Sequence, residues 1–123
     1  MLALPPPLDK LSNTPVLHSE MPAGFTRVSA LTLPADPRYH TLGALRIDFK
    51  NASQSESASY ALFKSAAQAA AFVPVESNIK TGGFFQIAVA RVGRIVIGAT
   101  GLTHAQASAL LRLAIAHLDR STR

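Results

Sequence analysis

The 123-residue chain has no cysteine and no tryptophan, and aromatic residues make up only 7% of it. The absence of cysteine excludes disulfide frameworks, thiolate metal sites and cysteine nucleophiles. It does not identify the compartment, because a cysteine-free chain suits a reducing cytosol and an oxidising exterior equally. The net charge of +5 favours encounters with polyanions. Nucleic-acid-binding modules, however, concentrate their charge and interleave it with stacking aromatic residues. Nucleic acid is therefore not expected as a partner.

Long apolar runs are also missing. No stretch of the sequence is long enough to cross a membrane, and Met1 leads into a proline-containing segment without the basic region and apolar core of an export signal. Apolar residues make up 48% of the chain, which is typical of a globular protein of one domain. We therefore expect a single soluble domain over residues 23–120, preceded by an arm at 1–22 and followed by a tail at 121–123.

The arm is rich in proline, which disfavours a continuous helix and favours extended conformations. Its prolines are Pro5, Pro6, Pro7, Pro15 and Pro22. Two interpretations remain open for it. It could be a tether between a membrane anchor and the folded body, or an ordinary ragged terminus.

The last third of the chain predicts a hairpin followed by a helix. Residues 84–91 alternate in polarity and residues 95–99 are short and β-branched, which indicates two strands. Gly93 between them can adopt the positive φ of a tight turn. Thr103 and Gln106 have the spacing of a capping box at a helix start. The helix after them carries one apolar stripe, formed by Ala107, Leu110, Leu111, Ala114 and Leu118.

An earlier stretch follows a similar plan. Residues 25–33 and 44–50 predict two strands, and residues 34–41 form a long polar loop between them. A second capping box at Ser53 and Glu56, with Ser55 as an equal candidate for the cap, predicts a helix to about Phe72, which Pro74 would end.

Strand, strand and helix thus occur twice. This repetition predicts an α+β domain of two layers, with a four-stranded antiparallel sheet and two helices on one face (ββαββα, two hairpin-helix halves). The other sheet face would be polar, covered by the arm or buried in a homodimer. The residues that could make that face apolar are Phe84, Ala88, Ala90 and either Val96 or Val28.

No catalytic motif is found in the sequence. The histidines lack metal-ligand spacing, no two carboxylates are neighbours, and no G-x-S-x-G elbow occurs. We therefore predict no catalytic residue, no metal and no cofactor. The candidates for contact with a ligand or partner are Tyr39 and His40 in the predicted loop, Asp48 on the strand after it, and Arg91 and Arg94 at the hairpin tip, where they could touch phosphates or acidic lipid.

The segment Ile87 to Ile97, together with the alanine- and leucine-rich helix after it, resembles the closing hairpin and helix of small extracytoplasmic domains in actinobacterial lipoproteins and kinase sensor regions. The proline-rich arm is similar to the tethers of such proteins. The resemblance implies a bacterial protein at the cell envelope, with a cleft beside the helices for a ligand or partner. It carries over no catalytic residues.

Three functions remain open at this point. The first is a non-enzymatic binding, sensory or accessory domain for an unknown small ligand or protein partner, outside the cytoplasmic membrane. The alternative is a cytosolic interaction module that dimerises through its open sheet face. The second alternative is an enzyme of unknown class that uses Tyr39, His40 and Asp48.

Overall fold

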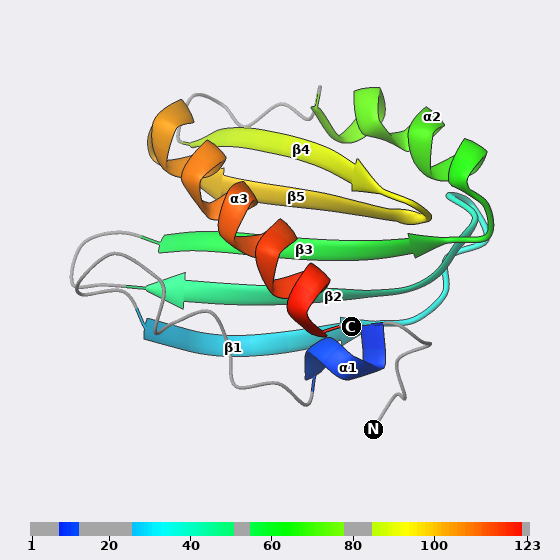
Figure 1. The fold of residues 1–123 in the computed structure, drawn as a ribbon, viewed down its shortest axis with the longest axis horizontal. Coiled ribbons are helices and arrows are strands. Elements are labelled where there is room, and N and C mark those ends of the chain that lie inside the picture. Colours follow the sequence, from blue (N-terminus) through cyan, green and yellow to red (C-terminus); the bar gives the residue numbers. More distant parts are fainter. Residues whose placement is uncertain (1–7, 13–25, 51–54, 78–84, 122–123) are drawn as a thin grey trace.

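The computed structural model describes residues 8–12, 26–50, 55–77 and 85–121. Five strands form one antiparallel sheet in the order β1-β2-β3-β5-β4, and three helices accompany it (Figure 1). The elements in chain order are α1 (Leu8–Ser12), β1 (Thr26–Leu33), β2 (Thr41–Lys50), β3 (Ser55–Phe63), α2 (Ala66–Ser77), β4 (Gln86–Val92), β5 (Ile95–Gly101) and α3 (His104–Ser121).

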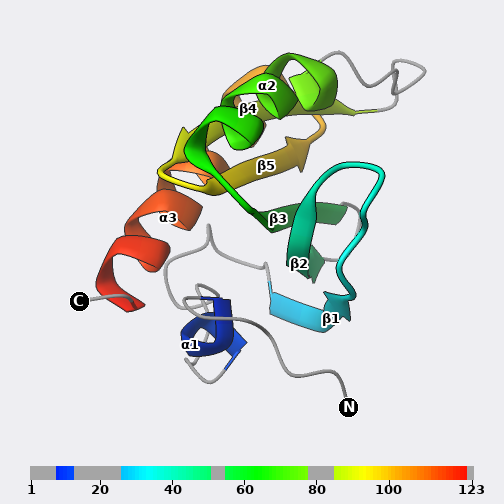
Figure 2. The same ribbon diagram turned by 90° about the vertical axis from the view of Figure 1, so that its right-hand side faces the viewer.

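The helices α2 and α3 lie on opposite faces of the sheet (Figure 2). Side chains alternate between the two faces of a strand. Tyr60 and Ile97 therefore pack with Leu110 of α3, whereas Val96 on the other face packs with Ala69 of α2. The α+β class and the antiparallel sheet are confirmed. The prediction of four strands with both helices on one face is wrong, since a fifth strand, a third helix and a second covered face are present.

The additional strand is β3, which lies where the sequence predicted the start of a helix. Alternate residues of β3 are buried, and the residues between them are exposed or half-buried up to Ala61. The buried members of this alternation are Glu56, Ala58, Tyr60 and Leu62. β3 pairs with β2 on one side and β5 on the other, so hydrogen bonds to two neighbours outweigh the helical propensity of its alanines and leucine.

The start and the end of α2 also differ from the prediction. Glu56 lies in a strand and caps no helix, and Ser53 lies outside the described residues. The N-cap of α2 is Ser65 instead, whose Oγ accepts a hydrogen bond from the Gln68 amide at 3.1 Å. α2 continues past Pro74 to Ser77. Pro74 cannot donate the helix bond to the Ala70 carbonyl, so the last turn of α2 follows one missing backbone hydrogen bond.

The last third of the chain matches its prediction. Gly93 has φ of 60° in the two-residue turn between β4 and β5. The Gln106 amide donates to Thr103 Oγ1 at 3.1 Å and the Thr103 amide donates to Gln106 Oε1 at 3.2 Å, so the capping box is confirmed. The apolar stripe of α3 faces the sheet, with Leu111 partly buried beside its buried members.

Helix α1 lies within the segment predicted to be an arm without regular structure. Leu8 and Leu11 of α1 are fully buried in the same core as α3, and α1 contacts both α3 and β2 (Figure 1). The other residues of the arm lie outside the described ranges. The described part of the arm is therefore packed on the domain.

The residues predicted for a dimer contact do not share one face. Ala88 and Ala90 pair with Ala99 and Ile97 and so face α3, whereas Val96 packs on the side of α2. Phe84 and the side chain of Val28 lie outside the described residues. The sheet surface that α2 leaves uncovered lies over β1, β2 and β3, and it carries the charged Arg46 and Asp48 together with the exposed Leu31 and Leu33. Dimerisation itself stays a prediction.

Candidate functional site

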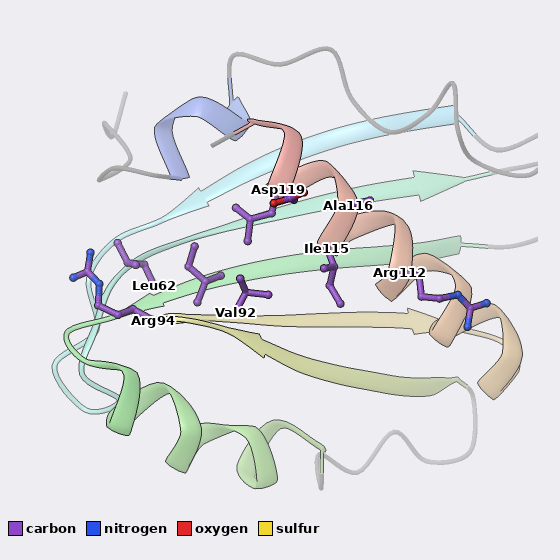
Figure 3. A pocket seen from close by; sticks show the side chains of 9 residues that line it. Leu62, Val92, Arg94, Arg112, Ile115, Ala116 and Asp119 are labelled. Atoms are coloured by element: carbon purple, nitrogen blue, oxygen red, sulfur yellow. The ribbon is translucent and has the colours of Figure 1, made fainter. Parts of the chain in front are cut away.

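A groove of about 530 Å³ opens between the β4–β5 hairpin and the C-terminal half of α3 (Figure 3). This volume falls within the range of small-molecule sites, about 300 to 1,000 Å³. Its lining residues come from β3, β4, the hairpin turn, β5 and α3, and they are Leu62, Val92, Arg94, Ile95, Arg112, Ile115, Ala116, Leu118 and Asp119.

The groove follows from the direction in which α3 crosses the sheet. α3 begins over β4 and β5 at the end of the sheet opposite the hairpin turn and runs diagonally towards β2, so the turn end of β4 and β5 is left without a helix over it (Figure 1). One side of the helix faces the widening space. The residues on that side are Arg112, Ile115, Ala116 and Asp119, which have the spacing i, i+3, i+4 and i+7 of a single helical face.

The floor and walls of the groove are apolar. Leu62 and Ile95 are buried beneath it, and Val92 on the rim is 41% exposed. Ile115 projects from α3 into the same space (Figure 3). The exposed apolar surface of Val92 and Ile115, together with that of a ligand, gains about 25 cal/mol per Å² when the ligand covers it. The groove can therefore bind an apolar chain.

Two arginines lie at opposite ends of the groove, Arg94 in the hairpin turn and Arg112 on α3 (Figure 3). The backbone of Arg94 is fixed, because its carbonyl accepts a hydrogen bond from the Phe63 amide at 2.8 Å. The ion pairs found among the described residues join Arg38 to Asp36 and Arg46 to Asp48. Arg94 and Arg112 therefore have no acidic partner in this part of the chain. Asp119 contributes one negative charge to the lining.

The structure separates Asp48 from Tyr39 and His40. Asp48 and Thr41 are seven residues apart on β2, which is roughly 23 Å at about 3.3 Å per residue. Asp48 Oδ1 accepts a hydrogen bond from Arg46 Nε at 2.9 Å. The grouping on which the enzyme alternative depended is therefore not brought together.

Tyr39 and His40 lie in the β1–β2 loop beside α2. The Tyr39 ring meets Phe72 edge-on at 5.6 Å, and the Arg38 guanidinium lies 5.5 Å from the Tyr39 ring centre. His40 has φ of 62°, and its carbonyl accepts a hydrogen bond from the Lys64 amide at 3.2 Å. These contacts tie the loop to the end of β3 and to α2, which is a structural role.

The two hairpin arginines face different sides. Arg94 lines the groove, whereas Arg91 pairs with Val96 on the face of α2 and donates from Nη1 to the Gly93 carbonyl at 2.9 Å. Sequence reasoning identified Arg94 but missed Arg112, because an arginine on an amphipathic helix has the appearance of a solvated residue. The i+3 and i+4 spacing to Ile115 and Ala116 was the available signal.

A second polar region lies between α2 and the sheet. Ser59 Oγ donates to Glu76 Oε1 at 3.4 Å above Gly98, which leaves room for the carboxyl group because it has no side chain. Burial raises the pKa of Glu76, and the hydrogen bond from Ser59 opposes this shift. The carboxyl group thus helps to seat the last turn of α2 on β3 and β5.

A second glutamate lies on the opposite face. Glu56 is 5% exposed, and its Oε1 would lie 2.9 Å from a Cβ placed on Gly101, which also comes within 3.0 Å of the Ala107 nitrogen at the start of α3. Burial raises the pKa of Glu56 as well. Both glutamates belong to helix–sheet contacts, and neither lines the groove.

Within the described ranges, no set of three or more histidine, aspartate or glutamate side chains could hold a metal ion. The helices of the same ranges include none with the length and apolar character needed to span a membrane. No protein-family model matches the chain, and no curated protein or solved structure is significantly similar to it. The resemblance to extracytoplasmic domains therefore stays a prediction.

Proposed function

We propose that the chain is a non-enzymatic binding domain whose groove takes an amphiphilic carboxylate, meaning an apolar chain with an acidic head. The observation that supports this proposal is the combination of an apolar floor with Arg94, which has no acidic partner among the described residues, at one end of a groove of ligand size. The apolar chain would cover Leu62, Ile95 and Ile115. The acidic head would accept two parallel hydrogen bonds from the Arg94 guanidinium.

The expected affinity is low. A chain of about ten methylene groups contributes about 8 kcal/mol if each buried group is worth about 0.8 kcal/mol. Lost translational and rotational freedom offsets several kcal/mol of that gain. With about 1.5 kcal/mol from the contact with Arg94, we therefore expect dissociation constants of about 0.1 to 1 mM for a single saturated chain.

The test is a titration of the full chain with dodecanoate, below the concentration at which it forms micelles, by isothermal titration calorimetry. Arg94→Gln should weaken binding about tenfold, because a hydrogen bond to a charged group contributes about 1.5 kcal/mol or more. Arg91→Gln is the matched control, since Arg91 belongs to the same hairpin but faces the other side. Ile115→Trp should fill the groove and abolish binding. A failure of dodecanoate to bind, or equal effects of the two arginine variants, would contradict the proposal.

A second candidate function is self-association through the uncovered part of the sheet. Leu31 and Leu33 on the edge strand β1 are 52% and 42% exposed, and they pair with Arg46 and Ala44 on the face away from α3. Sedimentation velocity over a range of concentrations should then show a dimer that Leu31→Lys weakens. Leu102→Lys, at another exposed leucine, is the control. A wild-type monomer at the highest concentration would remove this candidate.

The location outside the cytoplasmic membrane also stays a prediction. The proline-rich arm and the resemblance of the closing hairpin and helix support it.

A further inference from the structure

The groove has two cationic ends rather than one. Arg94 lies at the hairpin turn and Arg112 lies at the far end, with the apolar side chains of Val92 and Ile115 between them (Figure 3). A ligand with a single acidic head satisfies only one of these arginines. The other would keep a positive charge next to an apolar chain.

Both arginines are positioned by regular structure. The carbonyl of Arg94 is hydrogen-bonded to the Phe63 amide, and Phe63 is fully buried, so the turn has a fixed place relative to β3. Arg112 belongs to α3, whose helix axis is held by buried Leu110 and Ala114 on the side facing the sheet. The spacing between the backbone positions of the two arginines is thus set by the packing of α3 on the sheet.

Asp119 indicates where an acidic group would not bind. It lies one turn beyond Ile115 and Ala116 on the face of α3 that lines the groove. Its carboxyl group offers no cationic donor to a ligand carboxylate at the C-terminal end of that face. Arg94 and Arg112 remain as the two favourable positions for negative charge.

We infer that the groove takes a chain with an acidic group at each end, an α,ω-dicarboxylate, with one carboxylate at Arg94 and the other at Arg112. This inference rests on the proposed function and specifies its ligand class. The apolar middle of the ligand covers the floor of the groove, and each carboxylate meets one guanidinium. A length requirement follows, because a chain shorter than the groove cannot reach both arginines.

The experiment compares dodecanedioate with dodecanoate by isothermal titration calorimetry on the full chain. The dicarboxylate should bind about tenfold more tightly to the wild type, since one more charge-assisted contact forms. Arg112→Gln should remove that advantage and leave the affinity for dodecanoate within about twofold. Arg94→Gln should weaken both ligands, and Arg91→Gln should weaken neither.

A length series sharpens the test. Dicarboxylates from octanedioate to hexadecanedioate should show an affinity maximum at the length that spans the two arginines, whereas monocarboxylates should gain affinity steadily with each methylene group. Binding of dodecanoate that depends on Arg94, with no advantage for any dicarboxylate, would overturn the inference and leave the proposed function standing. Absence of binding by either class would overturn both.

Discussion

The two faces of the sheet are covered in different ways. On the α3 face, the large buried side chains of β2, β3 and β5 pack against α3 and α1, and the Tyr60 hydroxyl donates to the buried Ala114 carbonyl at 2.9 Å. On the α2 face, the fully buried members of the described core are only Phe63, Ala69 and Val96. The first face therefore carries most of the apolar burial, and the second leaves an uncovered surface over β1, β2 and β3.

Each helix nevertheless approaches β5 at a glycine that accommodates a glutamate. On the α3 face, Gly101 is close to Glu56 and also to the backbone of α3. On the α2 face, Gly98 is close to Glu76 and to the Ser59 hydroxyl, both of which are side-chain groups. A side chain added at Gly101 would therefore require the backbone of α3 to move, whereas one added at Gly98 would require only side chains to move.

The largest expected difference between the faces is in core truncation. Leu110→Ala should lower the free energy of unfolding by about 3 kcal/mol, because it leaves a cavity beneath α3. Phe72→Ala should lower it by about half as much, since Phe72 is only half-buried on α2. Urea denaturation measures both, with the exposed Leu102→Ala as a control that should change little. Equal losses for Leu110 and Phe72 would contradict the comparison.

The second-largest expected difference is in the stability cost of an alanine at Gly101 and at Gly98. Gly101→Ala places a Cβ 3.0 Å from the Ala107 nitrogen, so backbone must move, at a cost of about 2 kcal/mol. Gly98→Ala meets the Glu76 side chain, which can turn away, so about 1 kcal/mol is expected. A double-mutant cycle with Glu76→Ala should then recover most of the loss at Gly98. The corresponding cycle of Gly101→Ala with Glu56→Ala should recover little, and substantial recovery there would show that backbone contact is not the cause.

Removal of a helix cap should cost slightly more stability at α3 than at α2. The double variant Thr103→Ala/Gln106→Ala removes both reciprocal hydrogen bonds of the capping box and should cost about 1 kcal/mol or more, of which Thr103→Ala alone removes only the bond from the Gln106 amide. Ser65→Ala removes a single side-chain bond at the start of α2 and should cost less. Thermal unfolding measures both changes, and Thr103→Ser should retain wild-type stability. A larger loss at Ser65 than in the double variant would reverse the comparison.

The smallest expected effect is on the pH dependence of the unfolding free energy. Burial raises the pKa of both Glu56 and Glu76 above the ordinary value of 4.5, so the folded chain holds these protons more tightly than the unfolded chain. Their contribution to stability is complete below the ordinary pKa and is lost as the pH rises through the raised pKa. Glu56→Gln and Glu76→Gln should each flatten the decline in unfolding free energy above about pH 4.5, measured by urea denaturation. Ser59→Ala should raise the pKa of Glu76 further, and an unchanged slope in both glutamine variants would refute the assignment.

The success of the sequence-based prediction differed between the two halves of the chain. The β4–β5 hairpin and α3 were predictable because Gly93, the Thr103 capping box and the apolar stripe of α3 are local signals that agree with one another. β3 was not predictable in the same way, because its alanines and serines fit a helix as well as a strand. Only pairing with β2 and β5, which is tertiary, decides between them.

The residues of the groove could likewise be predicted only in part from the sequence. Arg94 was identifiable at a hairpin tip, but Arg112 becomes part of the site only through the angle at which α3 crosses the sheet. Tyr39, His40 and Asp48 appeared close in sequence, yet the length of β2 separates the loop from Asp48. Proximity along an extended strand is a poor guide to proximity in space.

The strand order has a consequence for how the chain reaches this structure. In the described sheet, three of the strand pairs join neighbours in the sequence: β1 with β2, β2 with β3, and β4 with β5. The remaining pair, β3 with β5, joins residues as distant as Ser57 and Thr100, which are 43 positions apart. Hairpins between neighbours close quickly, and distant pairing must first overcome a larger loop-closure entropy. The three-stranded meander and the closing hairpin with its helix can each assemble early. Their meeting along the β3–β5 ladder is then the slow step, so changes in this ladder should control the rate of folding.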